Sequence, residues 1–278
     1  MEHRVNTGIA IVLFCSLALA CSFLRPKPPL NWHVTLEVDK SLPDLQTATN
    51  QAVRVLETRL DALGVSNFEV RALGSPPDGR ILVNLPKVAD RERLKKLLSA
   101  EGRLEIAHVI SPPSPAAFQT YASKQDAEAS LGGTMPSNRR VLPYSERSDQ
   151  IPGDKTSPSV EAHEKWVVVE SPAIVDGTDL RDARAMPGDS GSGTYNIYFA
   201  LKPAGAQKFG EWTGANINEY MAVILNGEVK SVAYIKSPIS DAGEISGRFT
   251  RLSAEDLALV LRSGALPKVK IVEEGPNN

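Results

Sequence analysis

The stretch of this sequence most suggestive of chemistry is GDSGSG, from Gly188 to Gly193. A serine on a glycine-rich loop can act as the nucleophile of acyl transfer, and Ser190 would be that nucleophile. The chemistry also needs a histidine base and an aspartate that orients it, and no histidine here has the neighbours typical of such a base. Ser192 also stands where a G-x-S-x-G elbow requires its last glycine. We therefore predict a turn before a strand at Thr194, and keep an exported hydrolase only as the weakest alternative.

Residues that could hold a metal or a cofactor are equally sparse. Both cysteines, Cys15 and Cys21, lie in the apolar run at the start of the chain, which leaves no cysteine for a zinc site elsewhere. The histidines show no metal-binding spacing; they are His3, His33, His108 and His163. The sequence contains no P-loop and no dinucleotide-binding glycine run. We predict no cofactor, no metal and no enzyme activity.

Isolated carboxylates have a structural interpretation. Asp179, Asp182 and the pair Glu255–Asp256 are each expected at the start of a helix, where a negative charge is stabilised by the helix dipole. Composition excludes another class of function. The 278 residues are 42% hydrophobic and 23% charged with a net charge of −2, so no basic surface for nucleic acid is indicated.

The first segment, residues 1–30, has the features of an export signal or a membrane anchor. An uncharged run over 7–24 is followed by Arg25, Lys27 and prolines, and it falls slightly short of the ~20 apolar residues of a comfortable span. Ala18-Leu19-Ala20-Cys21 resembles a bacterial lipobox, in which Cys21 would carry lipid. Lipoprotein and uncleaved anchor both remain open. Either would tether the chain to a membrane, with residues from Pro26 onward outside the cytoplasm.

Residues 31–110 predict a ferredoxin-like domain. A capping box at Ser41–Asp44 should start the first helix and Gly64 should end it. The charged second helix should turn its leucines inward. The expected order is β-α-β-β-α-β, with strands over 33–39, 67–73, 80–86 and 103–110 and helices over 44–63 and 89–102.

Residues 111–164 have the composition of a linker or insertion. Prolines recur among Ser, Asp and Lys, and apolar periodicity is weak except for a short helix expected around 116–131. A connection this long is usually functional or disordered. We predict a partly disordered insertion, with a regulatory loop as the alternative.

Residues 165–252 predict a second, smaller α+β domain. Strands are expected over 165–170, 194–201 and 244–250, and a helix from Pro203. Asn226-Gly227 between two apolar runs indicates a tight hairpin. Over 253–278, a helix opening at Ser253–Asp256 and a final strand over 268–274 should return to the first domain.

Several motifs in the correct order resemble the SecD family of protein-export subunits. In the first domain these are Arg59, Leu63-Gly64-Val65, Gly79-Arg80-Ile81 and Leu85-Pro86. The second domain, ending in Arg262-Ser-Gly-Ala-Leu-Pro267, is similar to the family's head subdomain. The resemblance covers most of 52–109 and 172–274. The family's Asp-Leu-x-Gly-Gly stretch before the first strand is absent.

The resemblance implies a ferredoxin-like base, completed by the C-terminal strand, and a head that swings on it. It also implies that the head contacts emerging preproteins, by apolar contact and by strand addition at an exposed sheet edge. In the family, the chain after Gly-Ala-Leu-Pro returns to the membrane and supplies helices that use the proton gradient. The sequence given ends at Asn278, before such helices, which predicts an accessory protein without its own motor.

The expected partners are the Sec translocon or SecD/SecF-type membrane proteins, together with unfolded exported polypeptide. The expected place is the bacterial cell envelope, on the periplasmic side. No residue is identified as polypeptide-binding: Tyr198, Phe199, Trp212 and Tyr220 could line a groove but are expected in the core. The alternative from another class is a structural envelope lipoprotein that uses the same fold as an interaction scaffold.

Overall fold

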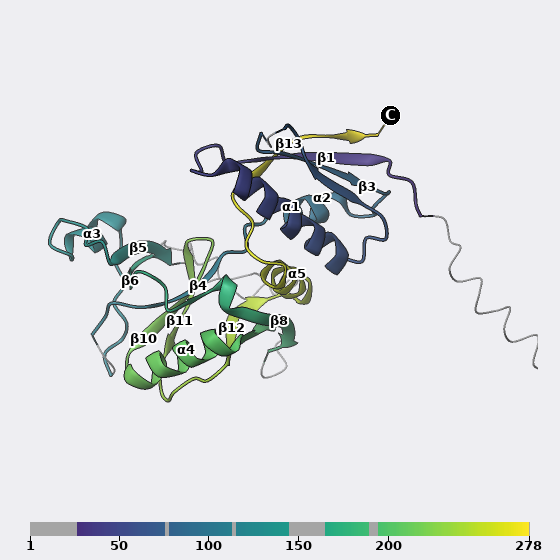
Figure 1. Cartoon of the computed structure of the whole chain (residues 1–278). Helices are drawn as coiled ribbons and strands as arrows, with labels where there is room; N and C mark the ends of the chain where they lie inside the picture. The colour runs from purple at the N-terminus through teal and green to yellow at the C-terminus, as the bar shows by residue number, and fades with distance from the viewer. Residues whose placement is uncertain (1–26, 76–77, 113–114, 145–164, 189–193, 278) are drawn as a thin grey trace, which may run out of the picture.

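The structure is a computed structural model that describes residues 27–75, 78–112, 115–144, 165–188 and 194–277. The candidate lipid site Cys21, with most of 1–30, lies outside the described residues, as do residues 145–164 and Ser190. Figure 1 shows two bodies, the base and the head, with a helix between them.

The base is an antiparallel four-stranded sheet in the order β13-β1-β3-β2, with two helices. Its elements are β1 (Trp32–Val38), α1 (Leu45–Ala62), β2 (Glu69–Ala72), β3 (Arg80–Leu85), α2 (Arg91–Ser99) and β13 (Val269–Pro276). Inward residues of β1, such as Val34 and Leu36, pack against Leu56 and Leu60 of α1. The order matches the predicted ferredoxin-like arrangement.

The ends of α1 follow from two local signals. Asp44 is the N-cap and accepts a hydrogen bond from the Thr47 amide. The capping box predicted from Ser41 is therefore wrong, because the Ser41 amide donates to Asp39 instead. The C-terminal end is as predicted: Gly64 has a φ of +71°, and its amide and the next one bond back to α1 carbonyls, a left-handed cap that favours glycine.

The strand that was expected to complete the base sheet, over 103–110, belongs to the head sheet instead. β4 (Leu104–His108) pairs with β10 and β7 rather than with β1. Leu104 and Ile106 are buried on one of its faces and Ala107 on the other, and a strand with both faces buried requires cover on both sides. The base offers one covered face, so β13 takes the position beside β1, as the resemblance implied.

The head contains a six-stranded sheet in the order β6-β5-β11-β10-β4-β7 and a three-stranded sheet in the order β12-β9-β8. The larger sheet curls until Val109, just after β4, bridges Val169 in β6. The remaining strands are β5 (Arg139–Tyr144), β6 (Lys165–Glu170), β7 (Val175–Asp176), β8 (Leu180–Pro187), β9 (Tyr195–Leu201), β10 (Tyr220–Leu225), β11 (Glu228–Tyr234) and β12 (Ala242–Phe249).

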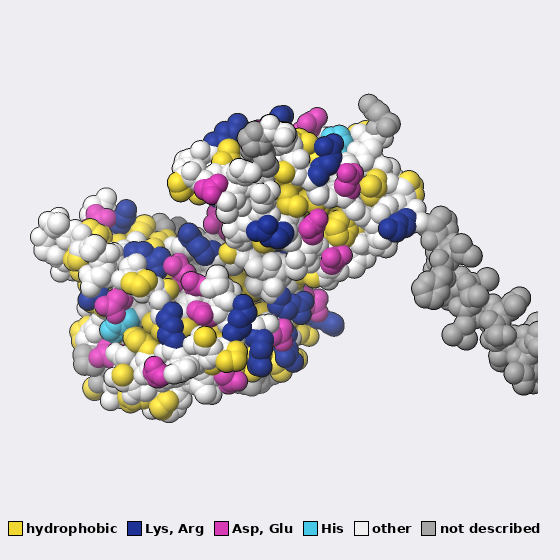
Figure 2. All heavy atoms as spheres, in the orientation of Figure 1, with side chains coloured by type: hydrophobic (Ala, Val, Ile, Leu, Met, Phe, Trp, Pro, Cys, Tyr) yellow, Lys and Arg dark blue, Asp and Glu magenta, His cyan; other side chains and the backbone are white. Residues whose placement is uncertain are grey.

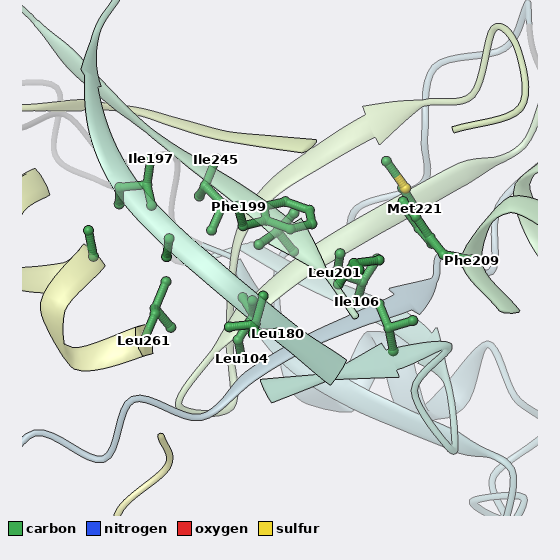
Figure 3. Close-up of a cluster of buried hydrophobic side chains, with 14 of the residues drawn as sticks. Leu104, Ile106, Leu180, Ile197, Phe199, Leu201, Phe209, Met221, Ile245 and Leu261 are labelled. Carbon is green, nitrogen blue, oxygen red and sulfur yellow. The ribbon is translucent and has the colours of Figure 1, made fainter. Parts of the chain in front are cut away.

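The helical segments in the described part of the head are α3 (Lys124–Ala129), η2 (Gly177–Asp179), α4 (Pro203–Ala215) and α5 (Arg251–Arg262). One apolar core joins the two sheets to α4 and α5. Figure 3 shows Phe199 and Leu201 of β9 meeting Leu104 and Ile106 of β4, with Leu261 of α5 nearby. The base and the head are thus separate in their cores, as an α+β protein of two units requires.

Two local predictions need correction. α5 begins at Arg251 with Thr250 as its N-cap, not at Ser253. Asp182 lies in β8 and pairs with Arg184, instead of starting a helix. In the described part of the insertion, α3 lies within the short helix expected around 116–131, and β5, which was not predicted, joins the head sheet.

No helix in the described part of the chain is long and apolar enough to cross a membrane.

The join between β13 and β1 should be acid-sensitive. The Glu37 carboxylate on β1 bonds to Lys270 of β13 at 2.8 Å and to Lys40 at 2.7 Å. These two lysines lower the pKa of Glu37 from 4.5 to about 2. A carboxylate with a lowered pKa stabilises the fold above its unfolded pKa and loses that contribution as pH falls through the folded value.

We therefore expect wild type to be more stable than Glu37→Gln above pH 4.5, with the difference vanishing as pH falls towards 2. Urea unfolding over a pH series measures it, and amide exchange in β13 localises it. Glu57→Gln is the matched control, since Glu57 on α1 has no ion-pair partner among the described residues. Parallel pH curves for wild type and Glu37→Gln would contradict the prediction.

Candidate functional site

The chain crosses between base and head twice, at 100–103 after α2 and at 263–268 after α5. Arg59, in the last turn of α1, points between the two crossings and is fully buried, with 0% of its surface exposed. A buried charge is costly unless every donor is used. The position of this guanidinium therefore defines the junction on which the head is mounted.

The nitrogens of Arg59 donate to both crossings. Nη1 donates to the carbonyl of Leu97 in the last turn of α2, at 2.7 Å, and to that of Ala100 on the first crossing, where Nη2 also reaches the Glu101 carbonyl at 3.5 Å. On the second, Nε donates to the Ser263 hydroxyl at 3.0 Å and Nη2 to the Gly264 carbonyl at 3.2 Å. One side chain of the base thus binds the chain both where it leaves and where it returns.

The acceptors of Arg59 are the C-terminal ends of two helices. α2 ends at Ser99 and α5 at Arg262, and the last carbonyls of a helix lack intrahelical donors and carry partial negative charge. Burial lowers the pKa of Arg59 to about 10, so the group stays charged at neutral pH. The cation is stabilised by backbone dipoles, because among the described residues no carboxylate forms an ion pair with it.

The first crossing also has a point where it changes from base to head. Gly102 has a φ of +69°, and a Cβ there would lie 2.5 Å from Val260 Cγ1, so only glycine fits. The next residue is bound to the head: the Arg103 amide donates to Asn226 Oδ1 at 2.9 Å, and the Asn226 amide donates to the Arg103 carbonyl at 2.9 Å. Gly102 therefore lies at the point where the chain passes from base to head.

α5 belongs to both units. Ala258 and Leu261 lie in the head core, while Asp256 accepts three hydrogen bonds from Nε and Nη2 of Arg93 of α2 in the base, the shortest at 2.6 Å. This pairing raises the pKa of Arg93. Such bidentate geometry fixes orientation as well as distance. The angle between head and base therefore depends on Arg59 and on the Arg93–Asp256 pair.

A cleft of about 530 Å³ lies beside the junction, between α1 of the base and β4 with η2 of the head. Its cationic lining residues are Arg103, Arg181, Lys202 and Arg262. Glu105 on the same wall is neutralised by Arg140 at 3.1 Å. Figure 2 shows Lys and Arg side chains gathered on the head near α5 and β8.

A cluster of partly exposed aromatic rings covers one end of the curled sheet. The aromatic cluster consists of Phe118, Tyr144, Tyr220 and Tyr234. Neighbouring ring centroids lie 5.6 to 5.9 Å apart in edge or tilted contacts, the spacing that aromatic pairs favour. Phe118, Tyr144 and Tyr220 also pack on the apolar cluster inside the curl. This is the largest set of adjoining aromatic side chains in the described residues.

The aromatic residues considered in the sequence are not brought together. Phe199 is a core residue with 2% exposure, as predicted, and Trp212 packs on the same core. The core prediction is wrong for Tyr198, which is partly exposed below the Arg184 guanidinium. Tyr220 is partly exposed and belongs to the aromatic cluster.

His108 has a polar environment on the other side of β4. Its Nδ1 lies 3.2 Å from Glu170 and its Nε2 3.6 Å from Glu219, and its ring meets Trp212 edge-on at 5.4 Å. Burial alone would raise the pKa of Glu170. The hydrogen bonds and charges of Arg139 and His108 outweigh burial, so the pKa of Glu170 lies below its usual value. Among the described residues, the polar partners of this imidazole are these two carboxylates. Over the described ranges, no three His, Cys, Asp or Glu side chains are grouped to hold a metal ion.

Sequence reasoning missed three members of the aromatic cluster. Phe118 and Tyr144 lie in the predicted insertion, where nothing indicated pairing with the head. Tyr234 lies opposite Tyr220 because the hairpin register shifts by one residue after Val223. A hairpin at Asn226-Gly227 without this shift would place Ala233 opposite Tyr220. The pairing of the two tyrosines therefore depends on a β-bulge, which the turn sequence does not predict.

Two family models match the chain. The model for the N-terminal part of the P1 domain of protein translocase subunit SecDF matches residues 49–111, and the model for the SecDF P1 head subdomain matches 154–268. The protein translocase subunit SecD of Koribacter versatilis is 39% identical over 84% of this chain and 40% of its own length. That of Aquifex aeolicus is 33% identical over 81% of this chain and 38% of its own length.

Solved structures agree with these matches. A structure of SecDF, a membrane component that enhances protein export, aligns with a TM-score of 0.60 at 29% identity, over 87% of this chain and 98% of its own. SecDF in a super-membrane-facing form aligns with a TM-score of 0.63 at 27% identity, over 93% of this chain and 34% of its own. The chain thus spans about 40% of the curated relatives that it matches.

Removing the Arg59 guanidinium should loosen the junction. Arg59→Met would leave several buried carbonyls without donors, each costing ~1–3 kcal/mol before water or relaxation compensates. We expect the free energy of unfolding to fall by about 3 kcal/mol, and Arg59→Lys, with fewer donors in another geometry, to lose part of that. Urea denaturation measures both.

Arg54→Met is the matched control, since Arg54 is an exposed arginine on the same helix. Distances between fluorophores on Lys96 in the base and Gln207 in the head should broaden in Arg59→Met only. Equal stability and equal distance distributions for the Arg59 and Arg54 variants would mean that Arg59 does not hold the junction.

Proposed function

This chain carries both parts of the P1 domain of the SecD family, and from that premise we propose that it is an accessory of Sec-dependent protein export that binds polypeptide on the periplasmic side of the bacterial envelope. The observation that carries the proposal is the alignment with the SecDF structure over 98% of that chain. Both units and their order are included in it, so the likeness extends beyond a common ferredoxin-like fold.

The head is the unit that we assign to polypeptide binding. Its aromatic cluster offers partly exposed ring faces and edges, which can contact apolar side chains of an extended chain whatever its sequence. Its curled sheet has an edge at β6, where backbone groups can pair with an added strand. Both features suit a partner that is unfolded while it is being exported.

The junction supports a head that changes angle on the base. Gly102 lies between backbone held by Arg59 and backbone held by Asn226, and hinges are formed by a few such connecting residues. We place the source of movement in a SecD/SecF-type membrane partner rather than in the described residues. The N-terminal segment, with Cys21 as candidate lipid site, would hold the chain beside that partner.

In-cell photo-crosslinking tests the assignment. A photo-reactive amino acid at Tyr234 in the aromatic cluster, or at Gln207 on α4, should form adducts with exported polypeptides during translocation or with Sec channel subunits. Lys96 on α2 is the control, because it is exposed on the base and forms no ion pair with any described residue. Adducts should disappear when export is blocked before the polypeptide reaches the periplasm.

Two outcomes would contradict the assignment: adducts only with folded envelope proteins, or the same adducts from Lys96 as from the head. Either would mean that the chain is a scaffold for other folded proteins and does not receive exported polypeptide.

A further inference from the structure

Residues 115–121, here called the strap, run across the aromatic cluster on the head. The chain leaves β6 after the Ile110 amide donates to the Val168 carbonyl at 2.9 Å. It returns at Tyr121, whose amide and carbonyl both bond to Trp166, at 2.8 and 2.9 Å. The strap has no α-helix or named strand of its own, so its conformation is set by what it contacts.

The strap contacts the head in the way that an extended peptide ligand would. At one end, Tyr121 adds a bridge to the edge of β6. In the middle, the Phe118 ring lies between Tyr144, at 5.6 Å, and Tyr220, at 5.9 Å. Ahead of it, the Tyr220 hydroxyl donates to the Ala116 carbonyl at 2.6 Å. Backbone pairing, one aromatic anchor and one bonded carbonyl are the components of β-strand addition with a side-chain pocket.

The surface and the strap have different relations to the SecD family. Trp166 and Tyr220 lie within the range matched by the head model, 154–268. The strap lies outside both matched ranges, since the other model ends at 111. The receiving surface thus lies mostly within the matched head range, and the strap lies between the two matched ranges.

We propose that the strap is an internal ligand, which occupies the site where the head receives an extended polypeptide with an aromatic side chain in the place of Phe118. The inference rests on the proposed polypeptide binding and adds the site and its chemical preference. Ala116, Ala117 and Gln119 are exposed on either side of Phe118, so an incoming segment would need only one bulky anchor among small or polar residues.

Occupation by the strap lowers the apparent affinity for other peptides. When only a fraction of molecules has the site free, the apparent dissociation constant rises by the reciprocal of that fraction. Each contact of the strap has a counterpart in an incoming strand, so exchange replaces bonds one for one. Polypeptides without an aromatic anchor would fail to displace Phe118, and the strap would act as a filter for apolar segments.

The test measures peptide binding to the full 278-residue chain. The probe is a fluorescent, unstructured peptide in which single phenylalanines alternate with serine and asparagine, and a second probe has serine for each phenylalanine. Phe118→Ala should bind the first probe about tenfold more tightly than wild type, a change of about 1.4 kcal/mol, on the order of one aromatic contact. The second probe should gain no affinity.

Two further variants separate loss of the strap from loss of the fold. Tyr220→Phe keeps the ring and removes the bond to the Ala116 carbonyl, a bond that an incoming strand would also make, so it should leave the affinity for the first probe close to that of wild type. Gln119→Ala is the matched control, since its side chain contacts only the neighbouring Thr120 carbonyl, and it should leave affinity unchanged. Circular dichroism melts identify any variant that has unfolded.

A synthetic peptide of residues 115–123, added in trans, should bind Phe118→Ala and compete with the first probe. If wild type and Phe118→Ala bind the first probe equally, and crosslinks still form in the head, the strap inference is overturned while the proposed function stands. If no variant binds either probe and crosslinking also fails, polypeptide binding itself is overturned, and the strap inference with it.

Discussion

The interaction on which the rest of the structure depends is the burial of one guanidinium between the ends of two helices. Arg59 lies where α2 and α5 both finish, and its donors are used by carbonyls and one hydroxyl of the two crossings. Uncapped helix ends must be satisfied somewhere, and two of them facing one another would leave a region of uncompensated negative potential. A single planar cation with several donors resolves both. The constraint works in both directions, since the cost of burying the charge is met only while both helix ends stay in place.

α5 converts this local arrangement into a relation between two units. Its apolar face completes the head core through Ala254, Ala258 and Leu261, and its polar face reaches the base through Asp256 and Ser263. Directional hydrogen bonds hold the base side, whereas nondirectional packing holds the head side. Displacement of the head would therefore break the bonds at Arg93 and Arg59 before it disturbed the head core. The fold thus separates a rigid helix–head body from a polar contact that can be remade, which is the arrangement that a hinged domain requires.

Sequence periodicity and the Gly64 cap predicted the two helices of the base well, although Asp44 and not Ser41 caps the first, because these helices are stabilised by local signals. Asp44, Gly64 and the leucines of α1 and α2 each act within one helix. The partner of β4 could not be predicted in this way, because strand pairing depends on which distant surface needs cover. The register of the hairpin could not be predicted for a related reason. A bulge after Val223 places Tyr234 opposite Tyr220, and the two-residue turn does not indicate that bulge. Phe118 lies in a proline-rich stretch without apolar periodicity, and its aromatic partners, Tyr144 and Tyr220, lie far along the chain.

A head that receives extended polypeptide has to protect its own sheet edges from indiscriminate pairing, because exposed edges also promote aggregation. In this chain the edge of β6 is covered by its own backbone, at Val109 and at Tyr121, and the curl removes most of the remaining edge of the larger sheet. Protection of this kind differs from a charged or bulged edge, since a covering segment can be exchanged for another segment of the same chemistry. Under the proposed function, the same hydrogen bonds both protect the edge of β6 and set the threshold that an incoming chain must exceed. A strap whose hold depends on one aromatic side chain makes that threshold a property of residue type.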